Sequence, residues 1–285
     1  MDISAFKRSR STTRNYLPDR HSDQPDNASV AIAGPAITRS STMTDSTKTT
    51  LITGASRGIG RRCAEQLAAS GHHIVNLDLD APDDEFPGDH FACDFSDRAA
   101  TRILLAELAE RYEFNGLLNN VGTVGEQSLE EIELKVFDHV MEINVIASIQ
   151  CAQACLPTMK KQGFGRIVNI SSDLVLGIPK RTAYSGTKSM LISFTRTWAL
   201  ELASHGITVN AVAPGPTNTE FFLRNNPIGS PQRERKLHRI AVGRFAEPAD
   251  IANAVGFLMQ DSSEFITGQT LFVDGGSGLG NALLP

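Results

Sequence analysis

A glycine-rich loop between a short apolar strand and a helix is the feature that most restricts how this chain can fold. Residues 49–53 have the pattern of a buried strand, Gly54-Ala-Ser-Arg-Gly-Ile-Gly60 follows, and helical periodicity then continues to Gly71. Glycines at such a junction let the backbone approach a pyrophosphate, whose charge is met by free amides at the positive end of the helix. An ordinary tight strand-to-helix turn is the alternative. The candidate cofactor-binding residues here are Gly54, Ser56, Arg57, Gly58, Ile59 and Gly60.

An acidic residue ends the second predicted strand, residues 73–79. Asp78 follows the glycine loop by about 20 residues, a distance at which a carboxylate accepts hydrogen bonds from an adenosine ribose. A carboxylate there repels the 2′-phosphate of NADP, whereas Arg57 would attract it. An uncompensated carboxylate beside a phosphate is harder to tolerate than an arginine beside a hydroxyl group. The sequence therefore favours NAD, with NADP as the alternative.

Strands and helices alternate along the rest of the chain. Only about ten residues, 79–89, separate the second strand from the third, so we expect a loop or a single turn there instead of a full crossover helix. The alternation predicts an α/β fold, a doubly wound, Rossmann-type parallel sheet in a single domain over residues 48–285. The further strands are expected at 90–93, 116–119, 166–171, 208–213 and 270–274, and the longer helices from 97, over 134–157, from 182 and over 248–259.

Polar residues and glycines follow several of these strands, at the sheet edge where open α/β folds bind ligands. Asp94 either approaches the adenine or caps the next helix, which Asp97 opens. Asn144 is a polar residue within an apolar helix, where its amide needs a partner; bonding to local backbone is the alternative to a functional role. The other candidates at strand ends are Asn120, Gly122, Ser171, Ser172, Pro214 and Gly215.

Tyr184 and Lys188 lie four residues apart at the start of a predicted helix, so one turn places a phenol beside an ammonium. A free tyrosine has a pKa of about 10, and an adjacent positive charge lowers it toward the range where general acid–base catalysis is efficient. A chance pair on a solvated helix face is the alternative. The motif therefore depends on the context that the other residues supply.

The charge and the cysteines exclude several classes of function. The chain carries a net charge of -5, but residues 1–42 are basic at +2 and leave the remainder at -7, which argues against nucleic acid or an anionic membrane as partner. No apolar run approaches the roughly 20 residues that span a bilayer. Four cysteines without a CxxC pair, and scattered histidines, predict no metal site and a reducing, cytoplasmic compartment.

Two segments outside the sheet have a distinctive composition. Residues 1–47 are rich in Ser, Thr, Arg, Asp and Pro without apolar periodicity, so we expect a disordered extension, and Met43 is an alternative start. Residues 217–242 contain two prolines and six basic side chains, a pattern expected of an irregular, mobile lid. A solvated basic face and an anionic-substrate clamp are equally compatible with that segment.

These motifs together resemble the short-chain dehydrogenase/reductase family, and the resemblance covers essentially everything after residue 47. Six motifs in order make coincidence a poor explanation. They are Thr53-Gly54-Ala-Ser-Arg-Gly58-Ile-Gly60, Asn119-Asn120-Val-Gly122, Asn144, Ser172, Tyr184 with Lys188, and Pro214-Gly215 followed by Thr219.

The resemblance implies a role for each matched residue. Tyr184 would be the general acid/base, Lys188 would lower its pKa and hold the nicotinamide ribose, Ser172 would bond the substrate oxygen, and Asn144 would order a water leading to Lys188. In the cofactor site, the three glycines would line the pyrophosphate. Asn120 would lie near the adenine-side ribose and Thr219 would face the nicotinamide amide, while Gly122, Pro214 and Gly215 complete the matched motifs.

Three departures from the family pattern are visible. Val121 stands where the family usually has Ala, and the crossover over residues 79–89 is short. Ser172 precedes Tyr184 by 12 residues, one fewer than in many relatives, whereas Ser171 precedes it by 13. Ser172 is the better candidate, because it is the eighth residue counted from Gly165.

The resemblance implies an NAD(P)-dependent oxidoreductase that interconverts a secondary alcohol and a ketone. The pattern is similar to that of 3-oxoacyl-thioester reductases, but hydroxysteroid, sugar and cyclic alcohol dehydrogenases share it, so the small-molecule substrate stays open. The alternative is a non-catalytic dinucleotide-binding sensor or scaffold, which would have no need of a proton donor. The family also implies a homotetramer in which helices near 135–157 and 184–204 pair.

Overall fold

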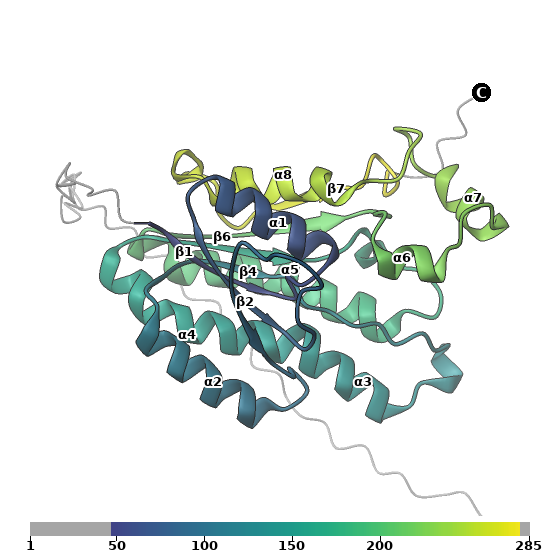
Figure 1. Ribbon diagram of the computed structural model, residues 1–285. Coiled ribbons are helices and arrows are strands. Elements are labelled where there is room, and N and C mark those ends of the chain that lie inside the picture. Colours follow the sequence, from purple (N-terminus) through teal and green to yellow (C-terminus); the bar gives the residue numbers. More distant parts are fainter. Residues whose placement is uncertain (1–46, 280–285) are drawn as a thin grey trace, which may run out of the picture. The chain divides into compact units, whose positions relative to one another are not determined.

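The computed structural model describes residues 47–279, and these contain one seven-stranded parallel sheet with the order β3-β2-β1-β4-β5-β6-β7. The chain runs outward from β1 to β3 in one direction and from β4 to β7 in the other, so the topology reverses beside β1 (Figure 1). Open sheets of this kind bind ligands at such a reversal, beyond the carboxyl ends of the strands. The predicted fold class, a doubly wound parallel sheet in a single domain, is confirmed.

The elements follow the expected alternation closely. The strands are β1 (Thr49–Thr53), β2 (His73–Asp78), β3 (Gly88–Ala92), β4 (Phe114–Asn119), β5 (Gly165–Ile170), β6 (Ile207–Pro214) and β7 (Thr270–Val273). The helices are α1 (Gly58–Ala69), α2 (Arg98–Arg111), α3 (Leu134–Met141), α4 (Ala147–Gln162), α5 (Thr182–Leu202), α6 (Glu220–Asn225), α7 (Pro231–Leu237) and α8 (Pro248–Met259).

Helices cover both faces of the sheet. In Figure 1, α1 and α8 lie above it, while α2, α4 and α5 lie below. Side chains alternate between the two faces of a strand. Leu51 therefore packs into the core between the sheet and α2, α4 and α5, whereas Ile52 packs into the core between the sheet and α1 and α8. Both side chains are fully buried. This two-sided burial explains why the strands are apolar runs without alternation.

The short crossover between β2 and β3 has no helix, as the sequence predicts; residues 79–87 form turns and bends. The segment 217–242 differs from the irregular chain that we expected, because it forms α6 and α7. Thr219 caps α6 by accepting a hydrogen bond from the Phe222 amide, and Ser230 caps α7. Pro231 opens α7 instead of interrupting a helix, because a first-turn residue needs no amide proton.

Residues 134–162 form one continuous helical segment, α3 and α4 joined by a π-helical turn at Glu142–Ile146. The segment is long and apolar enough to meet a length and hydropathy test for a membrane span, although the sequence showed no unbroken apolar run of that length. The α4 part packs against β4, and Cys151, Cys155 and Met159 are fully buried in the core. A core helix of a globular domain passes the same test.

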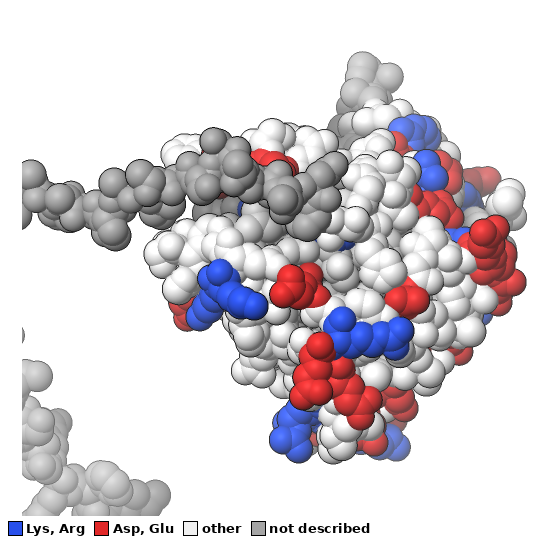
Figure 2. Space-filling model, turned by 60° about the vertical axis from the view of Figure 1, so that its left-hand side comes forward, with Lys and Arg blue, Asp and Glu red and all other residues white. Residues whose placement is uncertain are grey.

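The predicted disordered extension, residues 1–47, falls outside the described residues except for Thr47. On the face turned forward in Figure 2, positive and negative side chains of the described residues lie interspersed.

Candidate active site

The glycine loop joins β1 to α1 in a conformation that depends on its glycines. Gly54 and Gly58 have φ of 72° and 61°, values that L side chains rarely adopt. A Cβ on Gly60 would lie 2.2 Å from the Gly54 carbonyl oxygen, so only glycine lets α1 start this close to the strand. The N-cap residue of α1, Arg57, makes no side-chain capping bond, which leaves the first amides of the helix for a ligand.

Two asparagines, Asn76 buried and Asn120 partly buried, hold this loop in place. The Asn120 side chain donates to the carbonyl oxygens of Thr53 and Gly54 at 2.9 and 2.8 Å. From β2, Asn76 accepts from the Ala55 amide at 2.9 Å and donates to Ser56 Oγ at 3.0 Å. Asn120 was expected beside the ribose, whereas its amide is engaged with the loop backbone. Asn76 was missed, and its signal was a polar residue inside an apolar strand.

Asp78 at the end of β2 and Arg57 in the glycine loop gave opposite indications about the cofactor. Asp78 Oδ2 accepts a hydrogen bond from the Ser56 amide at 3.0 Å, so this carboxylate faces the loop. Arg57 forms an ion pair with Asp80, and both side chains are about half exposed. The guanidinium that would attract a 2′-phosphate is therefore already neutralised by a carboxylate next to Asp78.

Asp94 does not cap the next helix. Its Oδ1 accepts from the amide and hydroxyl of Ser96, while Asp97 caps α2 by accepting from the amides of Ala99 and Ala100. Asp94 is exposed, and it is not among the residues that line the central cavity described next.

A cavity of about 620 Å³ opens at the carboxyl edge of the sheet, beyond β4, β5 and β6. It brings together predicted residues of five separate motifs and leaves the glycines of the loop, Asp78 and Asp94 outside its wall. The predicted residues that line it are Ile59, Asn120, Gly122, Ser172, Tyr184, Lys188, Pro214, Gly215 and Thr219.

Tyr184 and Lys188 face this cavity from the first turns of α5. Lys188 is 3% exposed; its Nζ donates to the Ile170 carbonyl oxygen at 2.8 Å and lies 5.8 Å from the centroid of the Tyr184 ring. Burial lowers the pKa of Lys188 from 10.5 to about 8. Burial also raises the pKa of Tyr184 above its ordinary value of 10.0, against the opposing effect of a hydrogen bond with Ser172.

The pKa of Tyr184 is raised, whereas the sequence predicts that it is lowered, because there the effect of the Lys188 ammonium was taken to exceed that of burial. Desolvation dominates because the phenol enters the wall of the cavity between β5 and α5. Burial therefore makes both groups favour their neutral forms more than they would in water.

Two adjacent serines at the end of β5 have different surroundings. Ser171 Oγ donates to the Lys188 carbonyl oxygen at 2.9 Å, which fastens β5 to α5. Ser172 Oγ accepts from the Leu174 amide at 3.2 Å and lies 3.4 Å from Asp173 Oδ1. Of the two hydroxyls, only that of Ser172 lowers the pKa of the Tyr184 phenol.

Asn144 lies behind the cavity wall, in the π-helical turn between α3 and α4. Its side chain donates to the Thr123 carbonyl oxygen and to Thr187 Oγ1, both at 3.0 Å, and accepts from the Thr123 amide at 2.8 Å. A Cβ on Gly122 would lie 3.2 Å from Lys188 Nζ and 3.4 Å from Asn144 Oδ1, so these two polar groups flank the same glycine. Turns of this kind are frequent at functional sites.

The motif after β6 closes the cavity on its other side. Gly215 passes so close to β7 that a Cβ would lie 2.6 Å from the Asp274 Cα. Thr219 caps α6, and its methyl carbon lies 3.4 Å from the Cβ position of Gly58. The loop after β6 therefore reaches across to the start of α1.

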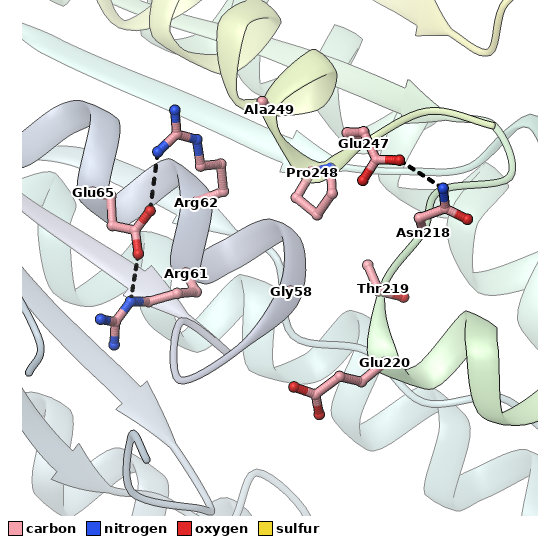
Figure 3. A pocket seen from close by; sticks show the side chains of 10 residues that line it. All are labelled: Gly58, Arg61, Arg62, Glu65, Asn218, Thr219, Glu220, Glu247, Pro248 and Ala249. Carbon is pink, nitrogen blue, oxygen red and sulfur yellow. Dashed lines mark hydrogen bonds and ion pairs between the residues drawn. The ribbon is translucent and has the colours of Figure 1, made fainter. Parts of the chain in front are cut away.

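A second hollow of about 430 Å³ lies beyond this contact, between α1, the loop after β6 and the start of α8 (Figure 3). Four of its five charged side chains, all but that of Glu220, already have a partner. Arg61 and Arg62 both bond Glu65, and Asn218 donates to Glu247 at 2.6 Å. The hollow contains none of the predicted catalytic residues.

The central cavity also holds charged residues that the motifs did not predict. Asp173, next to Ser172, accepts a hydrogen bond from Ser277 at 2.9 Å, and burial raises the pKa of its carboxyl. Arg181 forms an ion pair with Glu126 at 2.6 Å. These residues come from separate loops, and no local sequence pattern would have connected them.

The residues present fit a dinucleotide. The uncapped amides of α1 and the glycines that bring them to the strand suit a pyrophosphate, and the cavity beside Gly122, Tyr184 and Lys188 suits a nicotinamide ring. The two regions lie on the same edge of the sheet, at its topological reversal.

Comparison with known proteins gives relatives of the same kind. A family model described as enoyl-(acyl carrier protein) reductase matches residues 54–278. The 3-oxoacyl-[acyl-carrier-protein] reductase FabG of Staphylococcus aureus is 36% identical over 243 residues, covering 81% of this chain and 98% of the relative.

Two solved structures share the fold at greater sequence distance. A crystal structure of a candidate NAD(P)-dependent gluconate 5-dehydrogenase from Beutenbergia cavernae, with NADP bound at low occupancy, has a TM-score of 0.77 and 30% identity over 82% of this chain and 97% of that one. The aldohexose dehydrogenase of Thermoplasma acidophilum has a TM-score of 0.76 and 27% identity over 84% and 96%.

The order of the motifs, the sheet topology and these similarities agree with one another. On these grounds the chain belongs to the short-chain dehydrogenase/reductase family and is an NAD(P)-dependent oxidoreductase that interconverts a CH–OH group and a carbonyl.

Proposed function

We propose that Tyr184 exchanges the proton with the substrate oxygen while hydride moves between the cofactor and the carbon that carries this oxygen. NAD(P) supplies or accepts the hydride. Ser172 donates a hydrogen bond to the same oxygen and stabilises the charge that develops there. The observation that carries the proposal is the meeting of Ser172, Tyr184 and Lys188 in the wall of one cavity.

Lys188 and Asn144 support this proton transfer. Lys188 lies beside the phenol and would favour its ionised form once bound groups supply the polar surroundings that burial removes. Asn144 fixes the Thr123 backbone and Thr187, and flanks Gly122 opposite the Lys188 ammonium. We assign to it the ordering of a water that connects Lys188 to solvent.

We propose NAD as the preferred cofactor. The end of β2 presents Asp78 and Asp80, and Arg57 is paired with the second of them, so a 2′-phosphate would meet two carboxylates and one neutralised guanidinium. The gluconate dehydrogenase relative binds NADP. A titration with NADH and NADPH, followed by nicotinamide fluorescence, decides between the two cofactors.

The assembly, location and domain boundary are also proposals. Leu200 on α5 is 86% exposed, which supports pairing of this helix in a homotetramer. A monomer measured by light scattering would contradict it.

The four cysteines are free and buried, which is compatible with a reducing cytoplasm. The catalytic domain begins at residue 48, one residue before β1.

The test of the catalytic proposal is Tyr184→Phe. This variant keeps the ring and its packing but removes the transferable proton, so turnover should fall by about 10²- to 10⁴-fold while NADH binding stays within about threefold. Tyr112→Phe is the matched control, because Tyr112 donates to Asp89 near the start of β4 and does not line the cavity. Full activity of the Tyr184→Phe variant would contradict the proposed mechanism.

A further inference from the structure

The central cavity contains five charged side chains that the proposed proton transfer does not use. All of them lie on the side of the cavity formed by the loops after β4 and β5 and by the segment 217–242. They are Glu126, Asp173, Arg181, Lys236 and Arg239.

Three of the five are engaged with an oppositely charged side chain or with a hydroxyl. Arg181 is paired with Glu126 at 2.6 Å, so their charges cancel. Asp173 receives the Ser277 hydroxyl at 2.9 Å. Lys236 and Arg239 remain, and no carboxylate of residues 47–279 forms an ion pair with either of them.

Lys236 is fixed in position before any ligand binds. Its Nζ donates to Asn226 Oδ1 at 2.7 Å and lies 5.2 Å from the centroid of the Phe222 ring. Asn226 is 3% exposed, and its own amide donates to the Phe222 carbonyl oxygen at 3.0 Å. Burial, followed by the charge of Arg181, lowers the pKa of Lys236, against the opposing charges of Glu126 and Asp173. An anion beside this ammonium would reverse that effect.

The structure separates the basic residues of this segment by role. Arg233 packs its guanidinium 4.2 Å from the Phe245 ring centroid and donates to Asn218 at 2.7 Å, so it holds α7 in place. Arg224 and Arg235 are absent from the cavity wall. Only Lys236 and Arg239 line it, and they are three residues apart, at the end of α7 and just beyond it.

We propose that Lys236 and Arg239 bind a carboxylate of the substrate, so that the enzyme acts on a short oxo acid and its hydroxy acid. The proposal rests on the proposed function, because it places the reacting carbonyl at Ser172 and Tyr184. Arginine suits a carboxylate because its planar fork offers two parallel donors, and lysine adds a point charge.

The remaining walls restrict the carbon skeleton. Leu174, Ile178 and Phe221 contribute apolar surface to the same cavity. The volume of about 620 Å³ must also admit the nicotinamide, so it leaves space for a short chain. A short acid with its oxo group a few bonds from the carboxylate satisfies both ends of the cavity.

The test compares ketones that differ in charge. Acetoacetate and methyl acetoacetate share the 3-oxo group, but only the first is an anion, and dihydroxyacetone phosphate with dihydroxyacetone gives the same contrast for a phosphate. We expect wild-type kcat/KM to be at least about tenfold higher for acetoacetate than for its ester. Arg239→Gln and Lys236→Gln should each lower the acetoacetate value by about 10- to 100-fold, mainly through KM, and leave the ester within about twofold.

Arg235→Gln is the matched control, since it removes a positive charge from α7 outside the cavity wall. It should leave both substrates unchanged. Equal losses on the acid and the ester in the two cavity variants would overturn the proposal, as would a wild-type preference for the ester. If kcat/KM is higher for dihydroxyacetone phosphate than for dihydroxyacetone, but not higher for acetoacetate than for its ester, the basic pair binds a phosphate and not a carboxylate.

A binding measurement separates this proposal from the proposed function. Butyrate and butyramide have no ketone for the enzyme to reduce. Their binding to the NADH-saturated protein can be followed by nicotinamide fluorescence. Tighter binding of butyrate, lost in Arg239→Gln and kept in Tyr184→Phe, would support the carboxylate site even if every ketone were inert. Equal affinity for butyrate and butyramide would refute it, whatever the turnover.

Discussion

The two sides of the central cavity are built in different ways. The catalytic floor, defined as Asn144, Ser172, Tyr184 and Lys188, lies on or beside the sheet, and its polar groups are fixed by bonds to backbone atoms. The basic roof, Lys236 and Arg239, lies at the end of a seven-residue helix and just beyond it, and one aromatic ring and one buried asparagine position Lys236. Desolvation therefore acts strongly on the floor, where burial alone lowers the pKa of Lys188 to about 8.

This difference suits two tasks. Proton transfer requires groups held in a dry and fixed geometry, and such groups must be anchored to the core. Recognition of a charged substrate requires charges that reach solvent and attract it, and an outer loop provides these at lower desolvation cost. We expect substitutions in the floor to change kcat for every substrate, whereas those in the roof change KM according to substrate charge.

The largest expected effect within the floor distinguishes the two serines. Ser172→Ala removes the donor to the substrate oxygen and should lower kcat by about 10²- to 10³-fold. Ser171→Ala is the control, because its hydroxyl serves the Lys188 backbone carbonyl. It should cost about 1 kcal/mol of unfolding free energy and change kcat by less than about threefold. Steady-state kinetics and urea unfolding measure both. Equal damage to kcat by the two variants would contradict the assignment of Ser172.

The next effect concerns the stability that the folded protein loses by burying the Lys188 ammonium. Lys188 has a pKa near 8 when folded and an ordinary value of 10.5, a difference that corresponds to about 3 kcal/mol. Below pH 8 the folded protein bears the full cost of a buried ammonium. Between pH 8 and 10.5 the unfolded chain binds more protons, so wild-type stability rises with pH through this window.

Lys188→Met removes this titration, so the variant should gain stability relative to wild type at pH 7 and lose that advantage progressively by pH 10. The measurement is urea unfolding of both cofactor-free proteins at several pH values. Titration of Tyr184 is common to the two proteins and largely cancels in the comparison. A stability difference that does not change between pH 7 and 10 would show that Lys188 is not desolvated as the floor requires.

The smallest effect lies at the exposed end of the cofactor site, which resembles the roof in its solvent exposure. Asp80→Asn releases Arg57, so the ratio of NADPH to NADH affinity should rise, by up to about fivefold because the pair is half exposed. Fluorescence titration measures the ratio. Asp83→Asn removes a charge from the same loop without touching Arg57 and serves as control. A ratio that both variants change equally would indicate a general field and not this ion pair.

The floor was largely predictable from the sequence. The strands are buried on both faces and appear as apolar runs, so their ends could be located to within one or two residues, and parallel strands bring those ends to one edge. Tyr184 and Lys188 were placed together by helical spacing alone. The choice of Ser172 over Ser171 stays a prediction; the Ser171 hydroxyl donates to the Lys188 backbone carbonyl, and the Ser172 hydroxyl lowers the pKa of Tyr184.

The sequence by itself thus determined the sheet, its topology and the order of the chemical groups along its edge, because these follow from local periodicity and from the rules of parallel crossovers. Only the tertiary structure decided the partners of Arg57 and Asn120, the direction of the Tyr184 pKa and the separation of Lys236 and Arg239 from their basic neighbours. Those properties depend on burial and on contacts between residues far apart in the chain, and neither is encoded in a local pattern.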